Sequence, residues 1–277
     1  RVCHVLEHGL DALWRSNRAL DKARSDVEQL LDEKVQTEPE LAAVVNTFFE
    51  TMPKRYLLST PPRVLKRHVQ AFAASRGGVS VRFTSDASGD YTELTVCAPR
   101  RLGALATVAG VVSAHRCNIL SAQINTGREG GTLDVFAIQS SSGKAIVASA
   151  QARIEGDLHR ALRGELNVSE LLDQRRSGLP RREVPPVATV VTVDQGSSSR
   201  YTILEVKTRD RIGLLWVIAR CLLEAQCEIH VSKIATEGIQ VIDVFYLTYC
   251  SDTSRKLTDA EATSARELLL GALADFE

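Results

Sequence analysis

Few residues in this sequence have types and spacing that could perform catalysis. His4-Val-Leu-Glu-His8 spells the H-x-x-E-H pattern of inverted zincin proteases, and helical spacing would place both imidazoles one turn apart. A third carboxylate ligand is unidentifiable, and a solvated amphipathic helix face explains the same residues. We therefore expect no metal site there. His68, which follows Lys66 and Arg67 on a predicted helix, is expected to pack structurally.

The six cysteines are equally poor candidates for chemistry. They include no C-x-x-C pair and are too sparse for a disulfide framework in a chain of 277 residues. Cys117 and Cys227 begin equivalent strands of an internal repeat, which favours a buried small residue over a nucleophile. We expect most cysteines to be reduced packing residues, and no catalytic residue in this chain.

A binding site is indicated where a predicted strand turns directly into a helix, at Asp210-Arg-Ile-Gly-Leu-Leu215. The first turn of a helix has unpaired N–H groups and the positive end of the helix dipole, which can hold an amino-acid carboxylate. Gly213 would keep the approach clear, or would let the first helical turn pack closely on the sheet. Asp210 would cap the helix, or would accept the ammonium group of a ligand.

A second corner of this kind precedes it in the chain, although Arg100 there occupies the position matched by Asp210, which weakens the case for a ligand. The candidate ligand-contacting residues come from both corners and from one later strand. They are Asp210, Arg211, Ile212, Gly213, Leu214, Ser232, Arg101, Leu102 and Gly103.

An internal repeat positions these corners. Shifting the chain by 110 positions lays Tyr91-Thr-Glu-Leu-Thr-Val96 on Tyr201-Thr-Ile-Leu-Glu-Val206, and the match continues without gaps for about three dozen residues. One residue then drops out, so that Asp134-Val-Phe136 falls on Asp243-Val-Phe245. The length change lies where a hairpin turn is expected, because turns tolerate it better than strands do.

Each copy predicts the same α+β fold. Both are expected to form ferredoxin-like ββαββα units with four-stranded antiparallel sheets and two helices on one face. The expected strands are 79–83, 91–98, 117–126 and 132–139 in the first copy, and 189–193, 201–208, 227–236 and 240–249 in the second. The second helix of each copy is expected at 145–163 and 258–274.

The rest of the chain divides by composition. Residues 1–76 predict an all-α segment, with helical spacing to about Leu31, a helix from Glu38 to Glu50, and a third from Pro61-Pro62 to near Gly77-Gly78. The expected domains are residues 1–76, 77–172 and 187–277, with a charged Pro- and Gly-containing linker at 173–186. The chain opens with Arg1 inside a helical pattern, so we expect it to be a piece of a longer protein.

Overall charge excludes some classes of partner. The 34 basic residues balance 34 acidic ones, so no global field favours nucleic acid or an anionic membrane. No apolar run has the length of a bilayer span, and no signal-peptide pattern opens the chain. We expect a cytoplasmic location.

The repeat, with its strand, Asp-Arg-x-Gly-Leu-Leu turn and helix, resembles the ACT domain, a family of small regulatory modules that bind amino acids. Tyr201 to Tyr246 looks like the last ACT domain of bacterial PII uridylyltransferase/uridylyl-removing enzymes. Met52 to His68 is similar to the segment that connects the HD hydrolase domain of that family to its ACT pair. The resemblance covers nearly the whole chain, although Gly238-Ile-Gln240 stands where the family often has Gly-Glu-Arg.

The resemblance implies a regulatory region that binds glutamine or another small amino acid, acts on the PII signal protein through the parent enzyme, and controls nitrogen metabolism. It implies Mg²⁺ only for catalytic domains whose motifs this chain lacks. Gly196-Ser197 precedes Asp210, but Ile212 replaces the second carboxylate of the transferase, and the sequence has no His-Asp pair for the hydrolase. The alternative is a free-standing ACT sensor or adaptor without catalysis.

Overall fold

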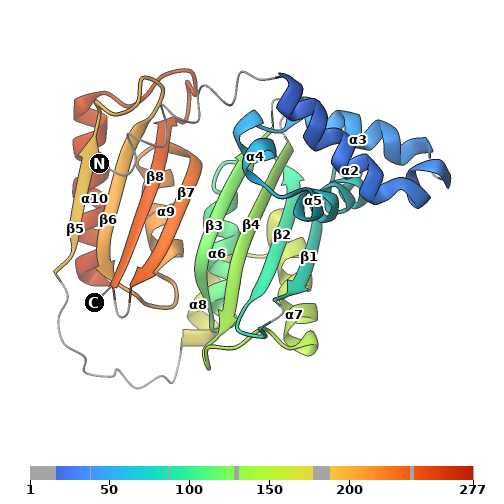
Figure 1. Ribbon diagram of the computed structural model, residues 1–277. Coiled ribbons are helices and arrows are strands. Elements are labelled where there is room, and N and C mark those ends of the chain that lie inside the picture. The colour runs from blue at the N-terminus through green and yellow to red at the C-terminus, as the bar shows by residue number, and fades with distance from the viewer. Residues whose placement is uncertain are drawn as a thin grey trace. The chain divides into compact units, whose positions relative to one another are not determined.

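The computed structural model describes residues 17–37, 39–86, 88–127, 131–176, 188–237 and 240–276 (Figure 1). By its internal contacts the chain forms two compact units. Unit 1 is Arg1–Ser80 with Thr95–Arg100 and Asn125–Asp134, and unit 2 is Val81–Leu94 with Arg101–Ile124 and Val135–Glu277. Unit 1 thus contains the helical segment and end residues of all four strands of the first sheet.

The described part of the helical segment confirms the predicted helices and adds a short one. The helices are α2 (Asn17–Thr37), α3 (Pro39–Thr51), α4 (Lys54–Ser59) and α5 (Pro62–Ser75). Pro62 stands in the first turn of α5, where its missing N–H costs nothing, and α5 ends at Arg76 in the left-handed conformation. The short helix α4 was not predicted. The His4 to His8 motif lies outside the described residues.

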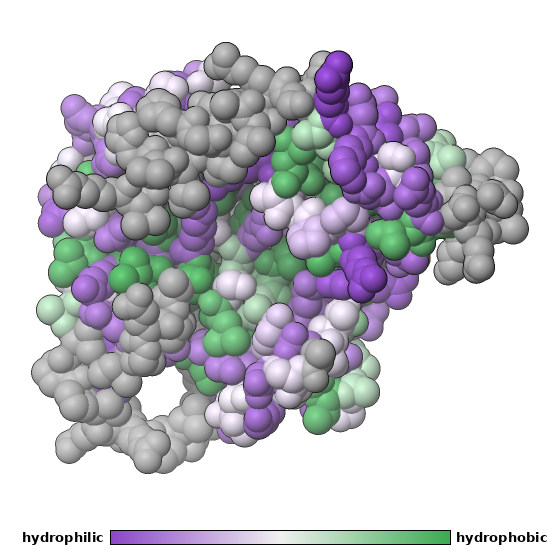
Figure 2. Space-filling view, in the orientation of Figure 1, coloured by the Kyte–Doolittle hydropathy of each residue, from purple (hydrophilic) through white to green (hydrophobic). Residues whose placement is uncertain are grey.

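Aromatic side chains fill the core of this helical segment. The ring of Phe48 meets the rings of Tyr56 and Phe72 edge to face, at centroid distances of 6.2 and 5.5 Å. The hydroxyl of Tyr56 is hydrogen bonded to Nδ1 of buried His68 at 2.5 Å. The packing role predicted for His68 is therefore confirmed. Hydrophilic residues cover most of the outward side of these helices in the view of Figure 2.

Both copies of the repeat form the predicted ββαββα unit. The first module (residues 80–162) has the sheet order β1-β2-β4-β3, and the second module (190–275) has the equivalent order β5-β6-β8-β7. The strands of the first are β1 (Ser80–Ser85), β2 (Thr92–Pro99), β3 (Cys117–Thr126) and β4 (Gly131–Ser140). Those of the second are β5 (Val190–Asp194), β6 (Thr202–Arg209), β7 (Cys227–Glu237) and β8 (Gln240–Tyr249).

Two helices accompany each sheet. They are α6 (Ala104–Ala114) and α7 (Ala148–Leu162) in the first module, and α9 (Leu214–Glu224) and α10 (Asp259–Asp275) in the second. The helices of each pair pack on one another, and α9 and α10 also contact strands of their sheet. Each module therefore has the two-layer architecture that buries the apolar face of an antiparallel sheet.

A repeated hydrogen bond shows how closely the two modules correspond. Thr92 and Thr202 are fully buried at equivalent positions on β2 and β6. The hydroxyl of Thr92 accepts the backbone N–H of Ile146 at 2.9 Å, and that of Thr202 accepts the N–H of Leu257 at 3.0 Å. In both modules this bond ties the segment that precedes the last helix to the same strand.

A helix that was not predicted runs into the start of the expected linker. Helix α8 (Val168–Arg176) continues past residue 173, so the first four residues of the predicted linker are helical. The Asn167 side chain accepts the backbone N–H of Ser169 at 3.0 Å, a capping bond that begins the helix, and Leu171 and Leu172 are buried. The charge of the segment concealed this short helix. Residues 177–186 of the predicted linker lie outside the described residues.

Among the helices that the structure describes, none combines the length and the hydropathy required of a bilayer-spanning segment.

Candidate functional site

The strand-to-helix corner of the second module is built around a left-handed glycine. Gly213 is the N-cap of α9 with φ 94° and ψ −5°, a conformation that side chains with a Cβ rarely adopt. No side chain caps this helix. The predicted capping role of Asp210 is therefore wrong, because the N-cap falls three residues later. Gly103 holds the same position before α6, with φ 75°.

The Asp210 carboxylate instead reaches the first module. Its Oδ2 accepts a hydrogen bond from Nδ2 of Asn118 on β3, at 3.1 Å. The residues concerned all belong to unit 2. The contact places the acid that the sequence indicated between two modules rather than at a helix end.

The two corner arginines hold the ends of helices. Nη1 of Arg211 donates to the carbonyl of Phe276 at 2.8 Å, and Nη1 of Arg101 donates to the carbonyl of Leu162 at 3.0 Å. Phe276 is the C-cap of α10 and Leu162 is the last residue of α7, so each guanidinium lies at the negative end of a helix dipole. The repeated bond indicates a structural role for both arginines. A ligand role for either remains a prediction.

The apolar corner residues differ in exposure. Leu102 and Ile212 occupy equivalent positions and are 53% and 40% exposed, whereas Leu214 is buried as the first residue of α9. The predicted ligand contacts of these three residues remain predictions.

Ser232 lies where the two modules meet. Its side chain is buried, and its Oγ donates to the carbonyl of Ala122 at 3.3 Å. Residues 122 and 232 are 110 positions apart, which is the offset of the repeat. Equivalent positions that contact one another lie on a two-fold axis, so the modules pair about a local pseudo-two-fold axis, as an isologous dimer does.

Further contacts repeat about the same axis. The equivalent helices α6 and α9 pack together. A Cβ built on Gly103 would lie 2.7 Å from Cδ2 of Leu223, and one built on Gly213 would lie 4.0 Å from Cβ of Ser113. Since Leu223 is the repeat equivalent of Ser113, each corner faces the far end of the helix of the other module. We call this interface the module seam.

A cavity of about 20 Å³ lies at the module seam. Asn118 and Cys117 border it from the first module, and Asp210, Gly213 and Asp243 border it from the second. A space of this size holds about one water molecule. The corner glycine and acid that the sequence predicted are thus brought together at one cavity.

Two acids in this cavity have perturbed protonation. Burial raises the pKa of Asp243 to about 7, and the negative charge of Asp210 adds to the effect. Burial also raises the pKa of Asp210, although the hydrogen bond from Asn118 opposes the shift. Oδ1 of Asp243 is buried without a hydrogen-bond partner among the described residues. The cavity therefore favours a cation or a hydrogen-bond donor.

Asp134, the equivalent acid of the first module, differs in one respect. Burial raises its pKa to about 7 as well, but its Oδ1 accepts the backbone N–H of Asn125 at 3.3 Å. Only Asp243, of these two acids, borders the seam cavity with an unpaired oxygen.

Asp243 and Asn118 border the cavity but were not predicted as site residues. Asp243 aligns with Asp134 in the repeat. An acid at the centre of an apolar strand, Val241-Ile-Asp-Val-Phe245, in both copies was the available signal. Asn118 carried no signal, because its contact with Asp210 crosses between modules.

Other candidate residues have structural explanations. Cys117 and Cys227 are buried, and burial raises the pKa of their thiols to about 11 and about 12, which confirms packing residues over nucleophiles. No cluster of three or more metal-ligating side chains occurs among the residues that the structure describes. A larger cavity, in unit 1, contains none of the predicted site residues.

Comparison with known proteins gives these modules a context. No family model matches the chain. It is 30% identical to the bifunctional uridylyltransferase/uridylyl-removing enzyme of Gluconobacter oxydans over 286 aligned residues, which cover 99% of this chain and 29% of that protein. A protein of the same name from Caulobacter vibrioides is 28% identical over 100% of this chain and 30% of its own length. One from Ruegeria pomeroyi is 31% identical over 68% of this chain and 22% of its own length.

The chain belongs with the C-terminal part of the bifunctional uridylyltransferase/uridylyl-removing enzymes. It spans less than a third of the length of these relatives. The resemblance of Tyr201 to Tyr246 and of Met52 to His68 to this enzyme family is thereby confirmed. Within this family context, the acids of the module seam and the corner arginines each lead to a testable expectation.

Replacing Asp243 by Asn should change how stability depends on pH. The pKa of Asp243 in the folded protein, about 7, lies above the ordinary value of 3.8. The contribution of Asp243 to the free energy of unfolding is therefore fully present below about pH 4 and is lost as pH rises through 7. The loss amounts to roughly 4 kcal/mol for a shift of this size. In urea unfolding, the stability of the Asp243→Asn variant relative to the native chain should be greater at pH 8 than at pH 5.

Asp252→Asn is the matched control. Hydrogen bonds from Ser254 lower the pKa of the exposed Asp252, so removing that acid should bring no gain at pH 8. A change in stability of Asp243→Asn that is equal at pH 5 and pH 8 would show that Asp243 does not titrate as inferred.

Removing either corner arginine should destabilise its module. Arg211→Ala and Arg101→Ala each lose a charge-assisted bond to a helix end, at a cost of about 1–2 kcal/mol. Arg153→Ala, on the exposed face of α7, is the control and should leave the free energy of unfolding nearly unchanged. Urea unfolding measures all three. Unchanged stability in Arg211→Ala together with loss of amino-acid binding would assign the arginine to the ligand instead.

Proposed function

We propose that this chain is the amino-acid-sensing regulatory region of a bifunctional uridylyltransferase/uridylyl-removing enzyme, with two ACT domains and glutamine as the ligand. The observation that carries the proposal is the seam cavity, where Asp210, Asp243 and Asn118 gather beside the N-terminus of α9. The names of the relatives support the enzyme family, and the resemblance of the repeat supports the ligand class.

The polar groups of the cavity match a zwitterion. Asp243, with its unpaired Oδ1, and Asp210 would take the ammonium group, because a buried anion gains most from a paired cation. The N–H groups of the first turn of α9 would take the carboxylate, since Gly213 and Leu214 border the cavity. Asn118 would exchange its bond to Asp210 for one to the ligand, and its amide suits a carboxamide side chain.

Binding must widen the module seam. The present cavity has room for about one water molecule, whereas sites for small molecules generally measure about 300–1,000 Å³. A ligand that fits only a widened seam binds that arrangement selectively and increases its population. The same difference in affinity would then act on whatever else depends on the arrangement of the modules.

The output follows from the resemblance. Glutamine would favour removal of uridylyl groups from the PII signal protein over their addition, in the cytoplasm, and would thereby couple nitrogen supply to nitrogen metabolism. The catalytic steps are not assigned to residues of this chain, where the transferase and hydrolase motifs are missing from the sequence. The chain contributes the sensing step.

Isothermal titration calorimetry of the 277-residue chain tests the proposal. Glutamine should bind saturably, and Asp210→Ala should weaken binding by about 10- to 100-fold through loss of a charge-assisted contact. The ligand ammonium would favour the ionised form of Asp243, whose pKa is about 7. Binding near pH 7 should therefore release protons, and the apparent enthalpy should differ between phosphate and Tris buffers.

Asp252→Asn, which alters an exposed acid away from the module seam, should bind glutamine like the native chain. Binding of a different amino acid that Asp210→Ala weakens would overturn only the identity of the ligand. The sensor itself would be overturned if no standard amino acid showed saturable binding that Asp210→Ala weakens.

A further inference from the structure

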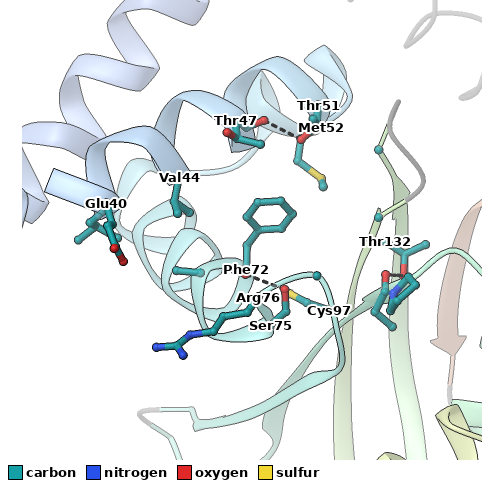
Figure 3. Close-up of a pocket in the computed structure, with 17 residues that line it drawn as sticks. Glu40, Val44, Thr47, Thr51, Met52, Phe72, Ser75, Arg76, Cys97 and Thr132 are labelled. Atoms are coloured by element: carbon teal, nitrogen blue, oxygen red, sulfur yellow. Dashed lines mark hydrogen bonds between the residues drawn. The ribbon is translucent and has the colours of Figure 1, made fainter. Parts of the chain in front are cut away.

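A larger cavity lies within unit 1 and has no part in the proposed sensor. It measures about 990 Å³, at the upper end of the range for small-molecule sites. Its walls come from α3, from the end of α5, and from the ends of β2 and β4 with the adjoining residues Gly127 and Gly131. Figure 3 shows these elements around a space that the ring of Phe72 enters.

The hydroxyl groups of this cavity present acceptors. Thr51 donates its proton to the carbonyl of Thr47 at 2.7 Å, and Ser75 donates to the carbonyl of Phe72 at 2.7 Å. Thr47 and Thr132 likewise donate to backbone carbonyls. A hydroxyl has one proton and two lone pairs, so each of these four oxygens still accepts but does not donate. The complement is a group rich in N–H donors.

The body of the cavity is apolar. Phe72 projects its ring between α3 and the strand ends, and Met52 and Cys97 lie on either side of it (Figure 3). Burial raises the pKa of Cys97 to about 12, so this thiol is neutral and forms part of the apolar wall. An apolar or aromatic group of matching shape would be buried here at a gain of about 25 cal/mol per Å².

Opposite charges stand on one side of the cavity. Glu40 on α3 and Arg76 after α5 both line it, and Figure 3 places the two charged groups on the same side of the Phe72 ring. Arg76 has φ 45°, a left-handed conformation that is uncommon for a residue with a Cβ, and the chain leaves α5 at this residue. A carboxylate and a guanidinium together can take the ammonium and the carboxylate of one zwitterion.

We propose that this cavity binds an α-amino acid with a large apolar side chain, phenylalanine being the simplest probe. The ammonium lies against Glu40, the carboxylate against Arg76, and the side chain against Phe72 and Met52. Glutamine is a poorer occupant, because its short polar side chain would leave the apolar surface of Phe72 and Met52 uncovered. The chain thus has a second amino-acid site of different specificity from the module seam.

Calorimetric titration with three related probes tests this site on the 277-residue chain. Phenylalanine should bind saturably. 3-Phenylpropionate lacks the ammonium group and phenethylamine lacks the carboxylate, so each should bind at least tenfold more weakly. Glu40→Gln and Arg76→Gln should weaken the binding of phenylalanine by a similar factor. The matched controls Glu50→Gln on α3 and Arg63→Gln on α5 lie outside the cavity lining and should have no effect.

A filling variant separates binding from folding. Val44 lines the cavity from α3, and Val44→Trp should abolish phenylalanine binding while circular dichroism and the unfolding midpoint stay close to those of the native chain. Equal binding of all three probes, or no saturable binding of phenylalanine, would overturn the proposal. Asp210→Ala, at the module seam, should leave phenylalanine binding intact, so this outcome is independent of the glutamine sensor.

Discussion

The pairing of the two modules about a local two-fold axis is the constraint on which the candidate site depends. Ser232 contacts Ala122 on this axis, and both residues occupy the same position in their repeats. Each corner is thereby placed against the helix of the other module, and Asp210 reaches Asn118. Neither module could form the seam cavity alone, so the duplication supplies the site as well as the fold.

The fold could be predicted from the sequence because its signals are local or repeated. Strand alternation, helical spacing and turn residues predicted the ββαββα order. The alignment of the two copies also located the hairpin turn, because one residue drops out there. The short helices α4 and α8 were missed for the opposite reason. A single helical turn or two has too few apolar positions to show a period, and the charges of α8 are typical of a linker.

The site was predicted less completely, for a physical reason. The corner glycines were found because they recur at equivalent positions of the repeat, and the structure gives both the left-handed conformation that suits glycine. The contact of Asp210 with Asn118 was not predicted, since the side chain of an acid before a helix can cap it or turn elsewhere, and only the tertiary structure decides. The arginines at both corners were similarly ambiguous until their bonds to Leu162 and Phe276 were seen.

Both modules bury an aspartate at the same position of the repeat, although burying a carboxyl group costs free energy of folding. An unpaired carboxyl in an apolar strand opposes folding, yet Asp134 and Asp243 hold equivalent positions. In the first module the N–H of Asn125 offsets that cost, whereas Oδ1 of Asp243 has no such partner among the described residues. Because of this difference, a ligand that donates a hydrogen bond to Asp243 would stabilise the second module.

Close packing of α6 and α9 at the module seam determines which kind of ligand can bind there. A Cβ on Gly110 of α6 would lie 2.7 Å from the ring of Trp216 on α9, so the two helices are in tight contact and the interface has little free space. A ligand that widens the seam loses part of this apolar packing and must offset the loss with its own contacts. Apolar contacts alone would only replace those that are lost. Charge-assisted bonds to Asp210 and Asp243 add a gain that the closed seam lacks, which favours a small zwitterion over an apolar molecule.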